Sequence, residues 1–268
     1  MAQARVEAFY ERVAEDRFLS SPYTTGPWDP GAQHAGPPAA LLALAAEERA
    51  GRVGEMRVAR ATYEIQRPVP VAPLTVTTRI LREGRSVQLV EATLSPDDGR
   101  EVMRVTMLRV RDSPDSAPAV QPGPEVPGPE GAKDDGFFPV PWEQGYHTAM
   151  EVRFTSGSFR ELGPATAWFR TRVPLIAGEE TTPLTRVLLA ADSGNGISGT
   201  VDFTRYVFVN ADLTVNLHRH PQGDWVCLNA RTSVDSSGIG LAESSLHDEK
   251  GPLGRGSQTL YVAPRPAG

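Results

Sequence analysis

One structural pattern occurs twice along this chain of 268 residues. Residues 74–111 and residues 225–265 both read as two strands, a glycine-containing turn and a further strand, and both follow a helical segment rich in Ala and Leu. Aligning Gly99 with Gly251 also brings two pairs of apolar residues into register, Leu108 with Leu260 and Val110 with Val262. An internal repeat limits the fold more strongly than any single motif, because each copy must build the same unit. We therefore expect two similar halves.

A proline-rich segment separates the two halves. Between residues 113 and 136, six prolines stand among small and polar residues, with almost no large apolar side chain. This composition cannot form a core, so it predicts a linker that is partly extended and partly mobile. We expect an N-terminal half at residues 1–112, the linker at 113–136 and a C-terminal half at 137–268.

Each half is expected to place strands beside one helix. In the N-terminal half, residues 4–18 have apolar residues at helical spacing and predict a short amphipathic helix. Residues 38–49 are apolar on nearly all sides before they turn charged, which predicts a buried helix with a proline in its first turn and Gly51 at its end. Strand patterns follow at residues 61–67, 74–81, 86–94 and 101–110.

The C-terminal half repeats this order. Residues 179–191 predict a second helix, which Thr181 or Thr182 can cap, with Pro183 at an early helical position. The segment SGNGISG then interrupts the pattern. The expected fold is α+β, with a sheet wrapped around each helix. Strands are predicted at residues 151–159, 167–173, 213–218, 225–233, 238–247 and 256–262.

Polar residues in the C-terminal half are candidates for chemistry. Asp192 closes an apolar helix, where burial makes an isolated carboxylate costly, although it equally suits a plain helix end. Gln258 lies in the last predicted strand, where a polar residue is usually just solvated. Between them, the sequence NADLTVNLH alternates polar and apolar residues, which predicts that Asn210 and Thr214 share one strand face. From spacing alone, a half-exposed strand and a functional site both stay open.

Composition limits the partners. A net charge of −6 and a pI near 5.5 argue against nucleic acid or an anionic membrane as the main partner. No run approaches the ~20 apolar residues needed to cross a bilayer, and the first residues lack a signal-peptide pattern, so we expect a cytoplasmic protein without membrane insertion. Cys227 is the single cysteine, which excludes a Cys-based zinc cluster. His218 and His220 lack a third ligand at metal-site spacing, so neither a metal nor a cofactor is expected.

Longer stretches of the chain resemble one known family. From LLAADSGNG through NADLTVNLHR to GRGSQTLYV, the C-terminal half is similar to the double hotdog acyl-CoA thioesterases, the acyl-CoA thioesterase II-like family. In the N-terminal half, GPWDPGAQHAGPPAALLALAAEE is similar to that family's opening turn and helix. The resemblance implies two antiparallel sheets side by side, each wrapped around one long helix. It also implies hydrolysis of fatty acyl-CoA to free acid and CoA, and we expect a homo-oligomer.

The same resemblance implies a catalytic set. The family has an Asp on the second helix, a Ser or Thr on the following strand and a Gln on the last strand, and Asp192 and Gln258 match the first and third. The strand position falls on Asn210, with Thr214 as the nearest hydroxyl on the predicted face. No GxSxG nucleophile motif is present, so water activated by Asp192 is the expected attacking group. One site per chain is expected, because Thr106 takes the place of Gln258 in the first copy.

Two other functions stay open. The departure at Asn210 fits a protein that binds acyl thioesters without hydrolysing them. The other is a hotdog hydratase acting on enoyl thioesters, a chemistry that usually relies on a paired Asp and His near a helix. The sequence indicates no His close to Asp192, so we rank the hydratase lower.

Overall fold

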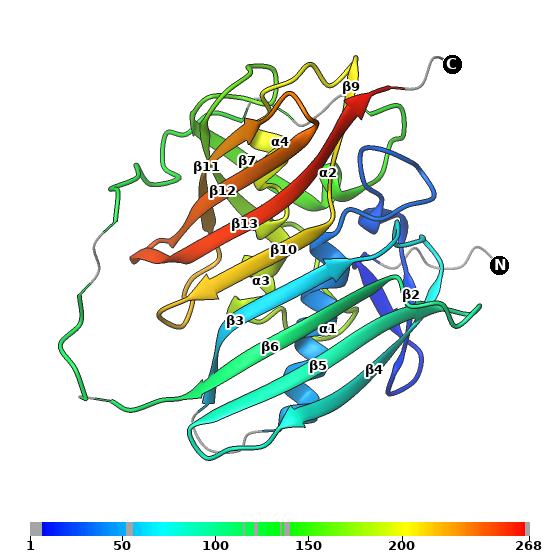
Figure 1. Ribbon diagram of the computed structural model, residues 1–268, viewed down its shortest axis with the longest axis vertical. Coiled ribbons are helices and arrows are strands. Elements are labelled where there is room, and N and C mark those ends of the chain that lie inside the picture. The colour runs from blue at the N-terminus through cyan, green and yellow to red at the C-terminus, as the bar shows by residue number, and fades with distance from the viewer. Residues whose placement is uncertain are drawn as a thin grey trace.

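The computed structural model describes residues 7–51, 56–114, 116–120, 123–134, 136 and 140–265. Its strands form one antiparallel sheet of 13 strands (Figure 1). In the first half these are β1 (Tyr10–Arg12), β2 (Arg17–Ser20), β3 (Met56–Ile65), β4 (Pro73–Arg82), β5 (Val87–Pro96) and β6 (Met103–Arg111). In the second half they are β7 (Met150–Ser156), β8 (Ala165–Thr171), β9 (Tyr206–Asn210), β10 (Asp212–Leu217), β11 (Val226–Val234), β12 (Ile239–Asp248) and β13 (Gly251–Pro264). The helices are α1 (Gly36–Ala50), α2 (Tyr146–Ala149), α3 (Pro183–Ala191), α4 (Gly194–Ile197) and a 3₁₀ turn (Pro22–Thr24).

The strand order is equivalent when read from either edge of the sheet. It runs β1-β2-β4-β5-β6-β3 through the first half and continues β10-β13-β12-β11-β8-β7, with β9 paired to β13. Each half therefore places its strands in the same sequence from the edge to the centre, where β3 pairs with β10. Gly99 and Gly251, which align in the repeat, both have a positive φ, of 72° and 110°. The internal repeat is visible in the topology.

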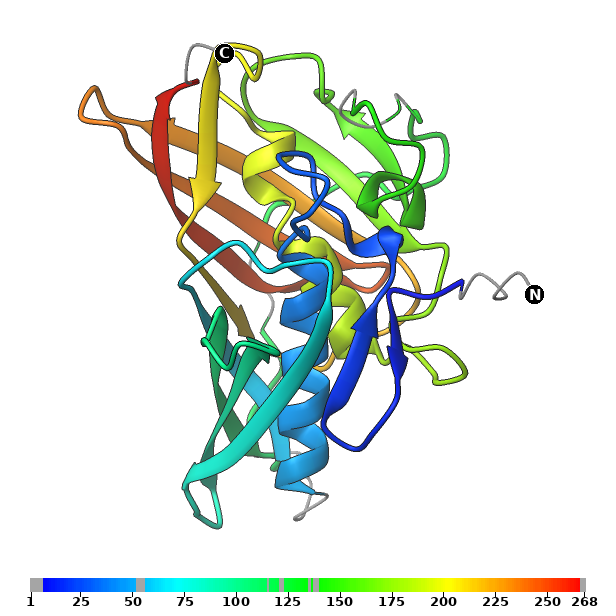
Figure 2. The same ribbon diagram turned by 90° about the vertical axis from the view of Figure 1, so that its right-hand side faces the viewer.

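The first half curves around α1. The helix has prolines in its first turn, where no N–H partner is needed, and ends at Gly51, whose φ of 62° suits a residue without a Cβ. Ala and Leu side chains between these ends are buried, and α1 lies against β4, β5 and β6 on the inner side of the sheet (Figure 2). The helix predicted over residues 38–49 is confirmed within these bounds.

The second helix is shorter than predicted. It starts at Pro183, after Thr182, whose Oγ1 accepts a hydrogen bond from the backbone N–H of Thr185 at 3.3 Å. The SGNGISG segment, predicted as an interruption, contains the short helix α4. Among the residues described, there is thus one long helix, in the first half, and the two halves share a continuous sheet through β3 and β10. In the part of the chain that the structure describes, no helix is long and apolar enough to cross a membrane.

The amphipathic helix predicted over residues 4–18 is wrong from residue 7 onward, the part that the structure describes. This segment forms the hairpin of β1 and β2, which continues the sheet next to β4. The backbone N–H groups of Phe9 and Tyr10 donate to the carbonyls of Pro174 and Leu175 in the second half, at 3.0 and 2.9 Å. A helix would use these N–H groups internally, so pairing with distant segments overrides the local pattern.

The linker packs on the second half along part of its length. The indole Nε1 of Trp168 donates to the carbonyl of Pro127 at 2.7 Å, and Val126 packs against Trp168 and Trp225. Lys133 forms an isolated bridge with Phe154 of β7. The domain boundaries at residues 112 and 136 stay a prediction.

α1 and α3 meet at Gly36. A Cβ added there would lie far inside van der Waals distance of the carbonyl oxygen of Leu189, so only Gly fits at this approach. The hydroxyl of Tyr146 donates to the same carbonyl at 2.7 Å. This contact sets the position of the first-half helix relative to the second-half helix.

Gly36→Ala should therefore force α1 and α3 apart. We expect the free energy of unfolding to fall by about 1–3 kcal/mol, as for other overpacked sites, measured by urea denaturation. Gly31→Ala is the matched control in the preceding loop, since a Cβ there comes no closer than 3.4 Å to Asp29 Oδ1. Equal stability of the two variants would contradict the tight helix contact.

Candidate active site

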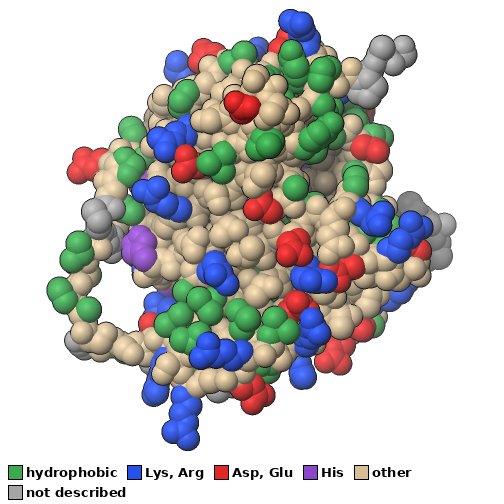
Figure 3. Space-filling model, in the orientation of Figure 1, with side chains coloured by type: hydrophobic (Ala, Val, Ile, Leu, Met, Phe, Trp, Pro, Cys, Tyr) green, Lys and Arg blue, Asp and Glu red, His purple; other side chains and the backbone are tan. Residues whose placement is uncertain are grey.

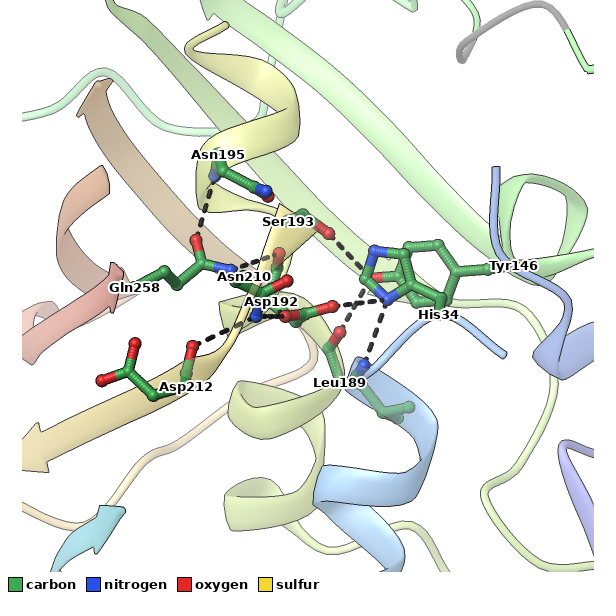
Figure 4. Close-up of polar contacts among 10 residues, drawn as sticks. His34, Tyr146, Leu189, Asp192, Ser193, Asn195, Asn210, Asp212 and Gln258 are labelled. Atoms are coloured by element: carbon green, nitrogen blue, oxygen red, sulfur yellow. Dashed lines mark hydrogen bonds and ion pairs between the residues drawn. The ribbon is translucent and has the colours of Figure 1, made fainter. Parts of the chain in front are cut away.

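Asp192 is a buried carboxylate directly after α3. The residue is 5% exposed. Its Oδ1 accepts hydrogen bonds from Asn210 Nδ2 at 2.8 Å and from Gln258 Nε2 at 3.1 Å (Figure 4). Removing a carboxylate from water is costly unless donors replace the water, and two amides do so here. The structure therefore gathers three of the predicted residues around one carboxylate oxygen.

Gln258 holds the turn that follows Asp192. It lies on β13 and its side chain reaches the inner face of the sheet, where Nε2 also donates to the backbone carbonyl of Asp192 at 3.0 Å. Its Oε1 accepts the backbone N–H of Asn195 at 3.0 Å. A Cβ on Gly194 would meet Oε1 at 3.0 Å, so the glycine leaves room for this approach. These bonds fix the orientation of the amide, with its N–H groups toward Asp192.

Asn210 and Thr214 lie on opposite faces of the sheet, so the predicted shared face is wrong. β9 ends at Asn210 and β10 begins at Asp212, and the alternation of faces breaks between the two strands. Thr214 pairs directly with Ser257, the neighbour of the inward-facing Gln258. Paired residues share a face and successive residues alternate, so Thr214 points outward. The structure does not bring Thr214 to Asp192.

His34, which the sequence did not indicate as a site residue, approaches the other oxygen of Asp192. Its Nδ1 lies 3.2 Å from Asp192 Oδ2. The backbone N–H of Gly36 donates to the same Nδ1 at 3.1 Å. The expectation that no His lies near Asp192 is therefore wrong. The contact forms only when the start of α1 packs on the end of α3, and nothing local in the sequence shows that packing.

Tyr146 fixes the ring of His34. The two rings are stacked, with centroids 3.7 Å apart and planes at 1° (Figure 4). The hydroxyl of Tyr146 donates to the carbonyl of Leu189 at 2.7 Å and lies 3.0 Å from Ser193 Oγ. The one sequence signal for His34 is a polar residue just before the buried helix that starts at GPP, and Tyr146 carries no such signal. Both halves thus contribute residues to the site.

Burial sets the charge of the aromatic groups. Burial lowers the pKa of His34, against the opposing pull of the Asp192 carboxylate. Because Nδ1 accepts the N–H of Gly36, the neutral imidazole carries its proton on Nε2. Burial also raises the pKa of Tyr146, so its hydroxyl remains a donor. Among the residues that the structure describes, no group of three or more His, Cys, Asp or Glu is arranged to hold a metal ion.

A cavity of about 360 Å³ adjoins these groups. His34, Asp192 and Asn210 line its polar part, and Arg67, two residues after β3, is an exposed lining residue. Trp28 packs edge-on against Phe208, with ring centroids 5.0 Å apart. The apolar part is lined by Pro27, Trp28, Ile65, Val69, Phe159, Phe208 and Ala211. The site can therefore hold an apolar group next to a buried carboxylate.

Stability should depend on pH through His34. Its folded-state pKa lies below the unfolded value of about 6.5, so the unfolded chain binds more protons in the window between them. Stability therefore rises with pH through that window and falls as the pH drops below about 6.5. Urea denaturation over this range should show a smaller pH dependence for His34→Phe than for the wild type. The other histidines with lowered pKa, His147, His220 and His247, contribute equally to both proteins. Parallel curves would contradict a buried neutral His34.

Solved structures share the fold. A proposed thioesterase II from Thermobifida fusca gives a TM-score of 0.75 at 22% identity, covering 95% of each chain. A hot dog fold protein of unknown function from Alicyclobacillus acidocaldarius gives 0.73 at 18% identity, covering 100% of each chain. A TesB protein from Mycobacterium avium subsp. paratuberculosis gives 0.68 at 18% identity, covering 95% of this chain and 96% of that one. At these identities the likeness establishes a hotdog fold alone. A comparison with curated protein sequences gave no match.

Two family models match the chain in the order of its halves. The acyl-CoA thioesterase N-terminal domain matches residues 24–110, which include His34 and α1. The acyl-CoA thioesterase C-terminal domain matches residues 114–262, which include Asp192, Asn210 and Gln258. The resemblance seen in the sequence is confirmed, and the chain belongs to the acyl-CoA thioesterase family.

Proposed function

We propose that the chain hydrolyses the thioester bond of fatty acyl-CoA by direct attack of water, with Asp192 as the general base. One observation carries this proposal: the Asp192 carboxylate is buried, lines the cavity and is held at Oδ1 by the amides of Asn210 and Gln258. A carboxylate fixed in this way can accept a proton from a water molecule beside it. Family membership supplies the substrate class, since the matching models are those of acyl-CoA thioesterases.

The proposed reaction needs one base and no covalent enzyme intermediate. Asp192 takes a proton from water, and the water oxygen attaches to the thioester carbonyl carbon. The tetrahedral intermediate breaks its C–S bond, the electron pair leaves with sulfur, and the sulfur takes the proton from Asp192. The products are the free acid and CoA. Asn210 can serve where the resemblance gives a Ser or Thr, because its amide donates to the carboxylate.

The cavity supports an acyl substrate. Its volume of about 360 Å³ falls in the range of small-molecule sites. Its apolar lining would take the acyl chain, while the polar part places the thioester next to Asp192. Arg67 is a positively charged, exposed lining residue, which suits the phosphates of CoA.

Asp192→Asn tests the base directly. The variant keeps the shape of the side chain but cannot take a proton, so kcat should fall by roughly 10²-fold or more, measured by free-thiol release from acyl-CoA. Asp212→Asn is the control, because that carboxylate accepts the N–H of Thr259 and is away from the cavity. Turnover retained in Asp192→Asn would sink the assignment of the base.

Trp28 should limit the length of the acyl chain. Trp28→Ala enlarges the apolar part of the cavity, where each buried methylene is worth about 0.8 kcal/mol. The ratio of kcat/KM for a long acyl-CoA to that for a short one should rise by roughly tenfold. A panel of acyl-CoAs of increasing length measures this ratio in both proteins. An unchanged preference would place the acyl chain elsewhere.

Hydration of enoyl-CoA is the second candidate function. The contact between His34 and Asp192 favours it, since this is the Asp–His pair that the sequence did not indicate. Hydration needs one group to take a proton from water and another to give a proton to the substrate carbon. Here Nδ1 of His34 already accepts the N–H of Gly36, so the pair consists of two acceptors, which fits hydrolysis better. With a short enoyl-CoA, hydrolysis releases free thiol, whereas hydration yields a hydroxyacyl-CoA without thiol.

A non-catalytic binder of acyl thioesters would bind acyl-CoA saturably and release no thiol. The departure from Ser or Thr at Asn210 favoured this function. Asn210 nevertheless donates a hydrogen bond to Asp192, as a catalytic partner would, so the departure argues less strongly for a binder.

We also propose a double hotdog architecture and assembly into homo-oligomers. The equivalent strand order in the two halves supports the first. For the second, neighbouring apolar side chains are exposed on β9, β12 and β13, where Figure 3 shows hydrophobic groups on the sheet surface: Val209 (39%), Ile239 (64%), Leu241 (45%) and Tyr261 (62%). A cytoplasmic location stays a prediction.

A further inference from the structure

Two hydrogen-bond acceptors face each other in the site. Nδ1 of His34 lies 3.2 Å from Oδ2 of Asp192, and the same Nδ1 accepts the backbone N–H of Gly36 at 3.1 Å. A backbone N–H keeps its proton and has a fixed direction, so it holds Nδ1 in the unprotonated form. An ionised carboxylate also only accepts. The pair therefore has no proton between its two atoms while Asp192 is ionised.

The surroundings keep the imidazole neutral and in place. The His34 side chain is 11% exposed and is stacked on the ring of Tyr146. Tyr146 is in turn anchored through its hydroxyl to the carbonyl of Leu189, and both residues are buried in the same hydrophobic cluster. Burial disfavours the charged imidazolium. The N–H of Gly36, which donates to Nδ1, likewise requires an unprotonated Nδ1. His34 is thus a fixed acceptor whose Nδ1 lies 3.2 Å from Oδ2.

We propose that His34 is a positioning residue for the base, whose Nδ1 accepts a hydrogen bond from Asp192 once Asp192 has taken the proton of the attacking water. This inference rests on the proposed function. The acceptor favours the protonated carboxyl group that forms during attack and directs its proton along the line from Oδ2 to Nδ1. Oδ1 meanwhile keeps its two amide donors.

The proton balance of the step is complete without a change in His34. A water O–H bond breaks, the O–H bond on Asp192 Oδ2 forms, and the hydroxide oxygen bonds to the carbonyl carbon. When the C–S bond breaks, its electron pair goes to sulfur, and the proton moves from Oδ2 to sulfur. Asp192 is again ionised, and His34 has kept one proton on Nε2 throughout.

Two substitutions of His34 distinguish the effect of the Nδ1 acceptor from the effect of ring packing on Tyr146. His34→Phe keeps the ring on Tyr146 and removes the acceptor. His34→Asn loses the ring but keeps an oxygen acceptor, because an Asn side chain readily accepts the N–H two residues ahead, here that of Gly36. We expect His34→Phe to lower kcat by roughly 10- to 100-fold, since a catalytic group misplaced by about 1 Å can cost up to 10²-fold, with KM changed by less than about twofold. His34→Asn should retain most of kcat.

Free-thiol release from one acyl-CoA, together with urea denaturation of each variant, gives the readout. Full activity in His34→Phe would overturn the inference, and so would an equal loss of kcat in His34→Asn and His34→Phe. If His34→Phe does not fold, His34→Gln replaces it, because its longer side chain cannot place an oxygen at the Nδ1 position, and it should lose kcat as expected for Phe. The wild type and Asp192→Asn are measured in parallel by the same two methods. Retained turnover in Asp192→Asn would defeat the proposed function, whereas a dead Asp192→Asn beside a fully active His34→Phe would defeat this inference alone.

Discussion

The rest of the site depends on the burial of the Asp192 carboxylate. An ionised carboxylate taken out of water costs several kcal/mol unless hydrogen-bond donors replace the water. Its donors come from the end of β9 and from the middle of β13, so the sheet must bring Asn210 and Gln258 together behind the end of α3. The contacts that make this burial tolerable are the same ones that orient the carboxylate toward the cavity.

The two halves of the repeat meet at this carboxylate in different roles. α1 contributes its beginning, with His34 just before it, and α3 contributes its end, with Asp192 just after it. Gly36 allows the two backbones to come close enough for this contact. The two halves therefore have equivalent strand orders but contribute different chemical groups. The first half brings the start of its helix to the shared site, and the second half brings the end of its helix.

Sequence patterns predicted the elements whose signals are local. The buried helix from Gly36 to Ala50 follows from a continuous apolar run between prolines and a glycine, and the paired strands follow from alternation between turn residues. Asp192 and Gln258 stood out because polar residues in apolar surroundings are costly. The N-terminal hairpin was missed because it pairs with β4, and its Phe9 and Tyr10 N–H groups bond to residues more than a hundred positions away. A helical spacing of apolar residues carries no information about such partners.

By itself, the sequence determined the repeat, the buried helix and the presence of a carboxylate and an amide in the C-terminal half. Only the tertiary structure decided which groups meet them. It placed Asn210 inside and Thr214 outside, because the alternation restarts between β9 and β10. It also brought His34 to Asp192 through the packing of two helices from different halves. Periodicity fixes which face a residue occupies only while a strand is unbroken, and it cannot specify contacts between distant segments, which packing decides.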